Sequence, residues 1–470
     1  MKRLAAIALL AISWTHTAGA QLSADSTQAV LTYGFDVGAG GSSIEGPNGQ
    51  RTRYQLVALM PTVRYGDWSG GLQINLRLRR FTLRDQDFDQ ARDYLSWLRF
   101  VQYRQKDDAG WHARLGALDE VELGYGQQVD AYTNMASLDD PQTGTVIDYR
   151  RRWLSVETLN AQILAPSVMA VRFAYQPLDR AYATPRIAFD KLVIGFSAAT
   201  DQRDESGFIN AENPGQPFFI DRPPIDTGDL QPILGTDDGA LWVVGMDVGV
   251  PFKLDRIVQS IGFASLNMMP GYGVGGSVGL QGTRPTQRFG RLRMQGELLL
   301  LGSQYLPSYF GALYEADRLR VLELDLDSGE TLEAVTSKRN LLIAEESFRL
   351  GSRTSVNYRY QEKVRFDLSY ERLWNRRNSG WLHADLRLQS PEWPFVLRLA
   401  YAKRNVGYLS SELGGGTSLL RAEGAYQFWE YLMLGLTVKQ SFEPAVRNAV
   451  FVGQAKRLRI EPKIVFVLRP

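Results

Sequence analysis

The 470-residue chain contains no cysteine, and its 53 basic residues nearly balance its 51 acidic residues. The absence of cysteine excludes a disulfide framework, thiolate metal sites and cysteine nucleophiles. The near-zero net charge argues against a surface built to bind nucleic acid. After the first twenty residues, no apolar run is long enough to cross a membrane as a helix. Predictions of fold and function must therefore come from the order of apolar and polar residues along the chain.

The first twenty residues have the pattern of a secretory signal peptide. Lys2 and Arg3 precede an apolar run over residues 4–12, and Ala18, Gly19 and Ala20 offer a small-residue cleavage site. We expect residues 1–20 to be removed and residues 21–27 to form a short N-terminal segment. Such a short segment has no room for a plug domain, so any transport is expected to be passive.

The mature chain repeatedly alternates apolar and polar residues, which indicates strands with one apolar face. In residues 364–370, for example, Val364, Phe366 and Leu368 alternate with Arg365 and Asp367. Several such runs approach the nine to eleven residues that a tilted membrane-spanning strand needs, whereas soluble strands typically have about five or six. Aromatic residues gather at strand ends, as in the interfacial girdles of membrane barrels.

The connections between these strands fall into two classes. Short turns such as residues 66–70 and 429–430 indicate hairpins, whereas long loops are predicted near residues 120–148, 201–239 and 305–337. Membrane barrels place short turns on one rim and long loops on the other. If the predicted strands run strictly up and down, loops 120–148 and 201–239 fall on opposite rims. We therefore expect that the strands predicted between Arg150 and Thr200 include one too many or one too few. Loop 201–239 is acidic and is interpreted as a solvated surface loop.

These features make the chain resemble the outer-membrane β-barrel proteins of Gram-negative bacteria. Segments 123–134 and 305–315 look like loop sequences of large barrels without an assigned activity. The resemblance implies an all-β fold: a single transmembrane antiparallel β-barrel of about 16–18 strands over residues 28–470. It also implies location in the cell outer membrane, contact with outer-membrane lipid and insertion by the barrel-assembly machinery. Pro462 in the last strand predicts a bulge or an imperfect seam.

If the apolar faces meet lipid, the alternating polar residues face the lumen. The pore-lining candidates are Arg77, Arg79, Arg291, Arg293, Glu297, Arg359, Arg365, Asp367, Glu371, His383, Asp385 and Arg387. The same argument places Arg99, Arg398, Arg421, Glu423 and Lys439 inside. Charged rings of this kind set the ion preference of a pore. Equally, arginine and carboxylate pairs can simply brace the barrel wall.

The function that fits best is a porin-like passive channel for small polar solutes, without a cofactor, metal or catalytic residue. The first alternative is a non-conducting barrel that serves as a structural or binding protein through its long loops. A barrel-wall hydrolase is the second, because His383 shares its face with Asp385, and Ser369 or Ser379 could lie nearby. The glycine-rich stretch 271–279 matches nucleophile and dinucleotide motifs, but more strand follows where both motifs need a helix.

Overall fold

The computed structural model describes most of the chain outside several loops and the N-terminus. The described residues are 31–45, 51–88, 91–104, 109–135, 142–164, 166–177, 191–202, 218–219, 240–253, 258–286, 290–317, 319–325, 331–337, 347–361, 363–374, 379–390, 392–406, 418–447 and 450–468. The expected signal peptide, the segment 21–27 and nearly all of loop 201–239 lie outside this set. No helix among the described residues is long and apolar enough to cross a membrane.

One large sheet dominates the structure. Its strands are β1 (Leu31–Glu45), β2 (Arg51–Tyr65), β3 (Trp68–Leu72), β4 (Ile74–Arg79), β5 (Thr82–Leu83), β6 (Leu98–Tyr103), β7 (Gly110–Gly116), β9 (Gly144–Arg150), β10 (Leu154–Asn160), β11 (Val168–Tyr175), β12 (Val193–Asp201), β14 (Leu241–Lys253), β15 (Gln259–Met269), β16 (Gly273–Thr286), β17 (Gly290–Leu301), β21 (Arg349–Tyr360), β22 (Val364–Leu373), β23 (Gly380–Gln389), β24 (Phe395–Val406), β25 (Ser418–Trp429), β26 (Leu432–Arg447) and β27 (Val450–Leu468).

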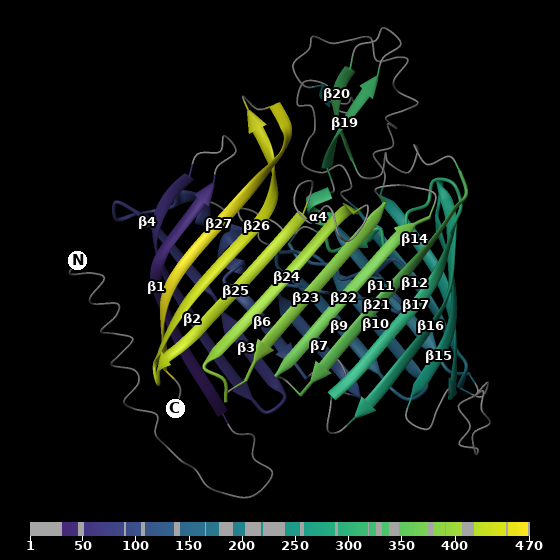
Figure 1. Ribbon diagram of the computed structural model, residues 1–470, viewed down its shortest axis with the longest axis horizontal. Coiled ribbons are helices and arrows are strands. Elements are labelled where there is room, and N and C mark those ends of the chain that lie inside the picture. Colours follow the sequence, from purple (N-terminus) through teal and green to yellow (C-terminus); the bar gives the residue numbers. More distant parts are fainter. Residues whose placement is uncertain are drawn as a thin grey trace, which may run out of the picture.

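The remaining elements are short. A second sheet joins β13 (Phe218–Phe219), β20 (Thr331–Ser337) and β19 (Leu319–Asp325), and it lies beyond one rim of the barrel (Figure 1). A parallel pair joins β8 (Val129–Asp130) to β18 (Phe310–Gly311). The helical elements are η1 (Asp85–Asp87), α2 (Ala91–Leu95) and α4 (Tyr314–Asp317).

The large sheet closes on itself. From β6 onward each strand of this sheet pairs antiparallel with the next, and β6 pairs with β3. The pairing of β1 with β27 completes the ring of tilted strands in Figure 1. Strands β3 and β4 both pair with β2 and form one interrupted strand, and β5 is a two-residue extension. The described residues therefore form a closed barrel of 20 strands. The predicted fold class, an all-β antiparallel barrel, is confirmed, and its location in a membrane remains a prediction.

The strand number exceeds the expected 16–18. Strands β6, β7, β9 and β10 have only six or seven residues, fewer than the length expected of a spanning strand. Strand β9 also begins inside the predicted loop 120–148, and the predicted loop 305–337 contains β18, α4, β19 and β20. Four strands, β9 to β12, separate the connection before Gly144 from the one after Asp201. Because four is even, both long connections leave from the same rim, as barrel architecture requires.

Burial follows the alternation that the sequence shows. On β17, Met294 and Leu298 are 51% and 53% exposed on the outer face, whereas Gln295 and Glu297 are 6% and 5% exposed on the inner face. Exposed Trp68, Trp111 and Trp429 stand on the outside beside the short turns. An apolar exterior with aromatic residues at its edge suits a bilayer.

The closing seam carries a polar cluster on its inner side. The register between β1 and β27 is constant, but the ladder is interrupted opposite Pro462, between the pairs Gly40–Lys463 and Ser43–Ile460. There is thus a gap in the seam and no bulge. Inside this gap, Ser42 Oγ donates to Glu461 Oε1 at 2.8 Å, and Arg77 Nη2 lies 3.1 Å from the same carboxylate oxygen. All three side chains are buried.

Replacing Glu461 with Gln should weaken barrel closure. The substitution leaves Arg459 without its buried counter-charge, whereas Arg77 keeps its ion pair with Asp87, so we expect the free energy of unfolding to fall by about 3 kcal/mol. Ser42→Ala removes only a hydrogen bond and should cost about 1 kcal/mol. Urea unfolding in detergent micelles measures both. Equal unfolding midpoints for Glu461→Gln and the wild type would show that backbone pairing alone closes the seam.

Candidate functional site

Part of the chain leaves the barrel wall and enters the lumen. At Gly116 and Gly144, which pair across β7 and β9, the backbone departs and returns. Gly116 has a φ of +130°, and a Cβ there would lie 2.6 Å from the carbonyl oxygen of Arg99, so no other residue fits without a shift. A Cβ on Gly144 would likewise meet Leu118 at 2.5 Å. We call residues 117–135, which follow this departure, the inner segment.

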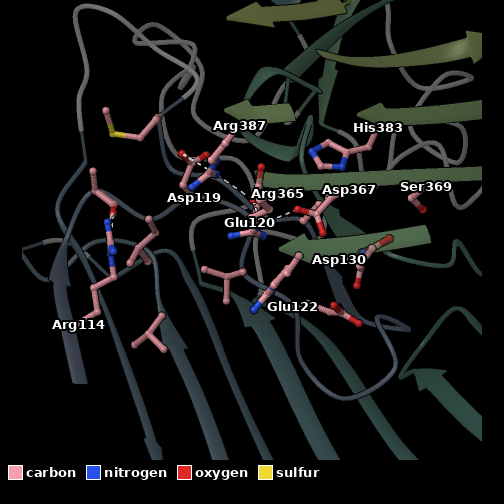
Figure 2. A pocket seen from close by; sticks show the side chains of 18 of the residues that line it. Arg114, Asp119, Glu120, Glu122, Asp130, Arg365, Asp367, Ser369, His383 and Arg387 are labelled. Carbon is pink, nitrogen blue, oxygen red and sulfur yellow. Dashed lines mark hydrogen bonds and ion pairs between the residues drawn. The ribbon is translucent and has the colours of Figure 1, made fainter. Parts of the chain in front are cut away.

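Carboxylates fix the beginning of the inner segment to arginines on β22 to β25. Glu120 lies 2.7 Å from Arg365 and 3.0 Å from Arg387, measured between carboxylate oxygen and guanidinium nitrogen. Asp119 forms an ion pair with Arg398. Figure 2 shows Asp119 and Glu120 turned toward Arg387 and Arg365. The contact of Asp119 with Arg398 is also a charge-assisted hydrogen bond, which is among the stronger polar interactions in proteins.

The middle of the inner segment is held by the opposite side of the barrel. The ring of Tyr125 stacks on Phe263 of β15, with centroids 4.2 Å apart. Gln128 Nε2 donates to Asn267 Oδ1 on β15 at 3.0 Å, and the Gly124 amide donates to Glu157 on β10 at 2.9 Å. The inner segment therefore crosses the lumen from the β22–β25 side to the β10–β15 side.

Arg353 on β21 joins the inner segment to the wall at a single buried point. Its guanidinium donates to the carbonyl oxygens of Gly126 at 2.8 Å and Tyr125 at 3.0 Å. It also forms an ion pair with Glu297 on the neighbouring strand and lies 3.3 Å from Asp130. Because its side chain is only 3% exposed, this arginine depends on all of these acceptors.

A second inner segment, residues 302–317, packs against the first. Strand β18 pairs with β8, and the Ser308 amide donates to the Gln127 carbonyl at 2.9 Å. Tyr309, Phe310 and Tyr314 form an aromatic cluster in the buried core. The core residues Val243 and Leu299 belong to β14 and β17. The two segments named in the sequence resemblance, 123–134 and 305–315, thus pack together and fill one side of the barrel.

On the other side lies a cavity of about 680 Å³, the arginine-rich cavity. Ten arginines and six carboxylates line it, together with neutral residues including His112, Phe100 and Gln102. The arginines are Arg99, Arg114, Arg150, Arg293, Arg353, Arg359, Arg365, Arg387, Arg398 and Arg421, and the carboxylates are Asp119, Glu120, Glu122, Asp130, Glu157 and Asp367. Its lining therefore carries an excess of positive charge.

Burial and neighbouring arginines have opposite effects on the pKa values of the acidic groups in the inner segment. Burial opposes ionisation of Asp119, but Arg398, Arg421 and Arg387 hold the pKa of this carboxyl well below its usual range. For Glu120, burial prevails over Arg365 and raises the pKa. Burial also raises the pKa of Asp130 to about 7, against the opposing effect of Arg353.

The structure brings half of the predicted pore-lining residues to the cavity. Those that line it are Arg293, Arg359, Arg365, Asp367, His383 and Arg387. Arg77 lies in the seam, and Glu297 and Asp385 have fully buried side chains that form ion pairs with Arg353 and with Arg387 and Arg398. Glu371, Arg79 and Arg291 are not part of the lining. A role in a pore remains a prediction for the whole set.

Sequence reasoning missed the residues of the inner segment and Arg353. Asp119 and Glu120 lie in a stretch without periodicity, so nothing in the sequence shows that they turn inward. Arg353 shares the inward parity of Arg359 on β21 and could have been found by extending the alternation back along that strand. Its role depends on a partner more than 220 residues away in sequence, which local patterns do not reveal.

The groups required for a wall hydrolase do not form a proton relay. Ser369 and His383 face each other across β22 and β23, and both are buried. The hydroxyl of Ser369 nevertheless has no hydrogen-bond partner among the described residues, so it does not bond to the imidazole. Figure 2 shows the two side chains apart. A serine nucleophile normally requires this hydrogen bond for activation.

Comparison with known proteins gives only distant likenesses. No protein-family model and no curated protein matches the chain. Among solved structures, Pseudomonas aeruginosa OccK11 (OpdR) has 9% identity and a TM-score of 0.30, covering 93% of this chain and 96% of that one. Acinetobacter baumannii OccAB2 has 8% identity and a TM-score of 0.28, covering 93% and 98%. A Rhodopseudomonas blastica porin mutant has 8% identity and a TM-score of 0.24, covering 93% and 100%. The fold assignment therefore rests on this chain's own strand pairing.

Arg353→Met should release the inner segment from the wall. The substitution keeps an apolar stem of similar length but removes the guanidinium donors to Tyr125 and Gly126 and the counter-charge of Glu297. Only the weaker neutral donors remain, namely Gln295 to Tyr125 and Ser308 to Gly126. We expect hydrogen exchange of the amides of residues 124–131 to accelerate by at least about tenfold. Hydrogen-exchange mass spectrometry measures the change.

Arg359→Met provides a matched control on the same face of β21. It should leave exchange in residues 124–131 close to the wild-type rate. Unchanged protection in Arg353→Met would contradict the assignment of Arg353 as the anchor.

Proposed function

We propose that the protein is an outer-membrane barrel that acts as a porin-like passive channel for small polar solutes. The observation that carries the proposal is the arginine-rich cavity, which lies inside a closed barrel beside the inner segment. Such a lining attracts water and ions, whereas a structural barrel would gain more from an apolar filling. The apolar exterior supports the location in lipid.

The two inner segments reduce the lumen without filling it. Barrels of 16–18 strands already leave an aqueous channel, and wider ones are commonly plugged. Here the buried aromatic core packs against β14 and the end of β17, so the proposed path runs along β6, β7 and β21 to β25, whose arginines line the cavity. This path is narrower than the barrel and is charged along its wall.

Reconstituted protein should conduct, with a preference for anions. In a planar bilayer with a KCl gradient we expect stable ohmic current steps and a reversal potential displaced toward that of chloride, because the lining has an excess of arginine. Asp119→Asn should increase the chloride-over-potassium permeability ratio about twofold. Asp67→Asn, on a turn outside the cavity, is the matched control and should have no effect.

A silent bilayer that contains verified folded barrel would overturn the channel. That outcome favours the alternative, a non-conducting barrel that serves as a structural or binding protein through its long loops.

The anion preference should be stronger at pH 5 than at pH 8. Because the pKa of Asp130 is about 7, this carboxyl is neutral at the lower pH and adds one negative charge to the cavity at the higher pH. Arg353, Arg293, Glu122 and Glu297 act on it electrostatically and set the midpoint. Asp130→Asn should reduce the difference between the two reversal potentials. An identical pH response in this variant would exclude Asp130 as its source.

A further inference from the structure

A β-bulge places Arg99 in the arginine-rich cavity. Gly71 of β3 pairs with Phe100, but the next residue, Leu72, pairs with Leu98, so Arg99 is the extra residue of β6. Phe100 also lines the cavity, and two consecutive residues of a regular strand cannot face the same side. The bulge therefore allows both Arg99 and its neighbour Phe100 to face the lumen, and Arg99 has the inward orientation that the sequence predicts. Bulges commonly re-aim a side chain in this way near functional sites.

Arg99 differs from the other cavity arginines in lacking a partner. Arg365, Arg387, Arg398 and Arg421 each form ion pairs with carboxylates. The guanidinium of Arg99 forms no hydrogen bond or ion pair with any described residue. The residue lines the cavity, so an anion in the cavity can reach it. A guanidinium has five donors in a rigid fork, so a suitably placed anion could accept two parallel hydrogen bonds.

The carboxylates near Arg99 are already paired with other arginines, so Arg99 is available to bind such an anion. The acidic groups that act on it are Glu423 and Asp119, and both already accept from arginines: Glu423 lies 2.7 Å from Arg421, and Asp119 forms an ion pair with Arg398. Lys463 of β27 lies within electrostatic reach of Arg99 and also has no hydrogen-bond or ion-pair partner among the described residues. Positive charge is therefore uncompensated around Arg99, although Lys463 itself does not line the cavity.

We propose that Arg99 binds the carboxylate or phosphate group of a small anionic solute as it passes through the cavity. This inference rests on the proposed channel function and names its substrate class. Carboxylate and phosphate share the geometry that a guanidinium recognises through two parallel hydrogen bonds. A cavity of about 680 Å³ is large enough for a small organic anion.

The test compares Arg99→Gln with the wild type and with Arg104→Gln. Gln removes the charge and the fork, and Arg104, which is paired with Asp67 near the turn, provides the same charge change outside the cavity. Acetate and inorganic phosphate serve as separate probes, added at millimolar concentrations to a bilayer in KCl while the reduction of single-channel current is recorded. For at least one probe, the concentration that halves the current should rise about tenfold in Arg99→Gln and stay unchanged in Arg104→Gln.

The outcomes separate this inference from the channel itself. If only acetate or only phosphate responds, that probe identifies the solute group. If the wild type conducts but Arg99→Gln is blocked as strongly as the wild type, Arg99 is not the binding residue and the channel stands. If the wild type is silent, the channel fails, and calorimetric titration of both probes into the folded barrel in detergent decides the binding. Heat that is lost only in Arg99→Gln supports the site, whereas equal heat or none in the wild type overturns it.

Discussion

Closure of the sheet between β1 and β27 is the constraint on which the rest of the structure depends. A closed sheet satisfies the backbone hydrogen bonds of every strand and leaves no open edge, which is the condition for a β-structure in lipid. Closure also divides each strand into an outer and an inner face. The outer face is apolar, so the charged residues that alternate with it are directed into the lumen, where they need partners or water.

The inner segments provide partners for many of these charged residues in the lumen. Glu120 and Asp119 form ion pairs with arginines of β22 to β24, while Arg353 donates to two backbone carbonyls of the inner segment. The aromatic core between the two segments fills the remaining volume on one side. What remains unfilled is the side where arginines outnumber carboxylates. The position at which the inner segment attaches to the wall therefore determines both the shape and the charge of the proposed path.

The sequence predicts the barrel well and its interior poorly. Alternation such as that of Leu292, Met294 and Leu298 with Arg293, Gln295 and Glu297 reports a local property, the two faces of a strand, and this is why the fold class could be predicted. Strands as short as β7 and β9 fall below the length by which spanning strands are recognised, so the strand count was too low. The positions of Asp119 and Arg353 depend on long-range packing, which has no periodic signal. The bulge at Arg99 is likewise defined only by its pairing with β3.

Thiol labelling of single-cysteine variants most directly tests the central claim that the lumen holds an arginine-lined aqueous path. Because the chain has no cysteine, Ser355→Cys in the cavity lining and Thr354→Cys on the exposed outer face of the same strand give clean probes. In lipid vesicles, Ser355→Cys should react with charged methanethiosulfonates, faster with an anionic than with a cationic reagent, and Thr354→Cys should stay unmodified. An unreactive Ser355→Cys, or faster reaction with the cationic reagent, would contradict the account.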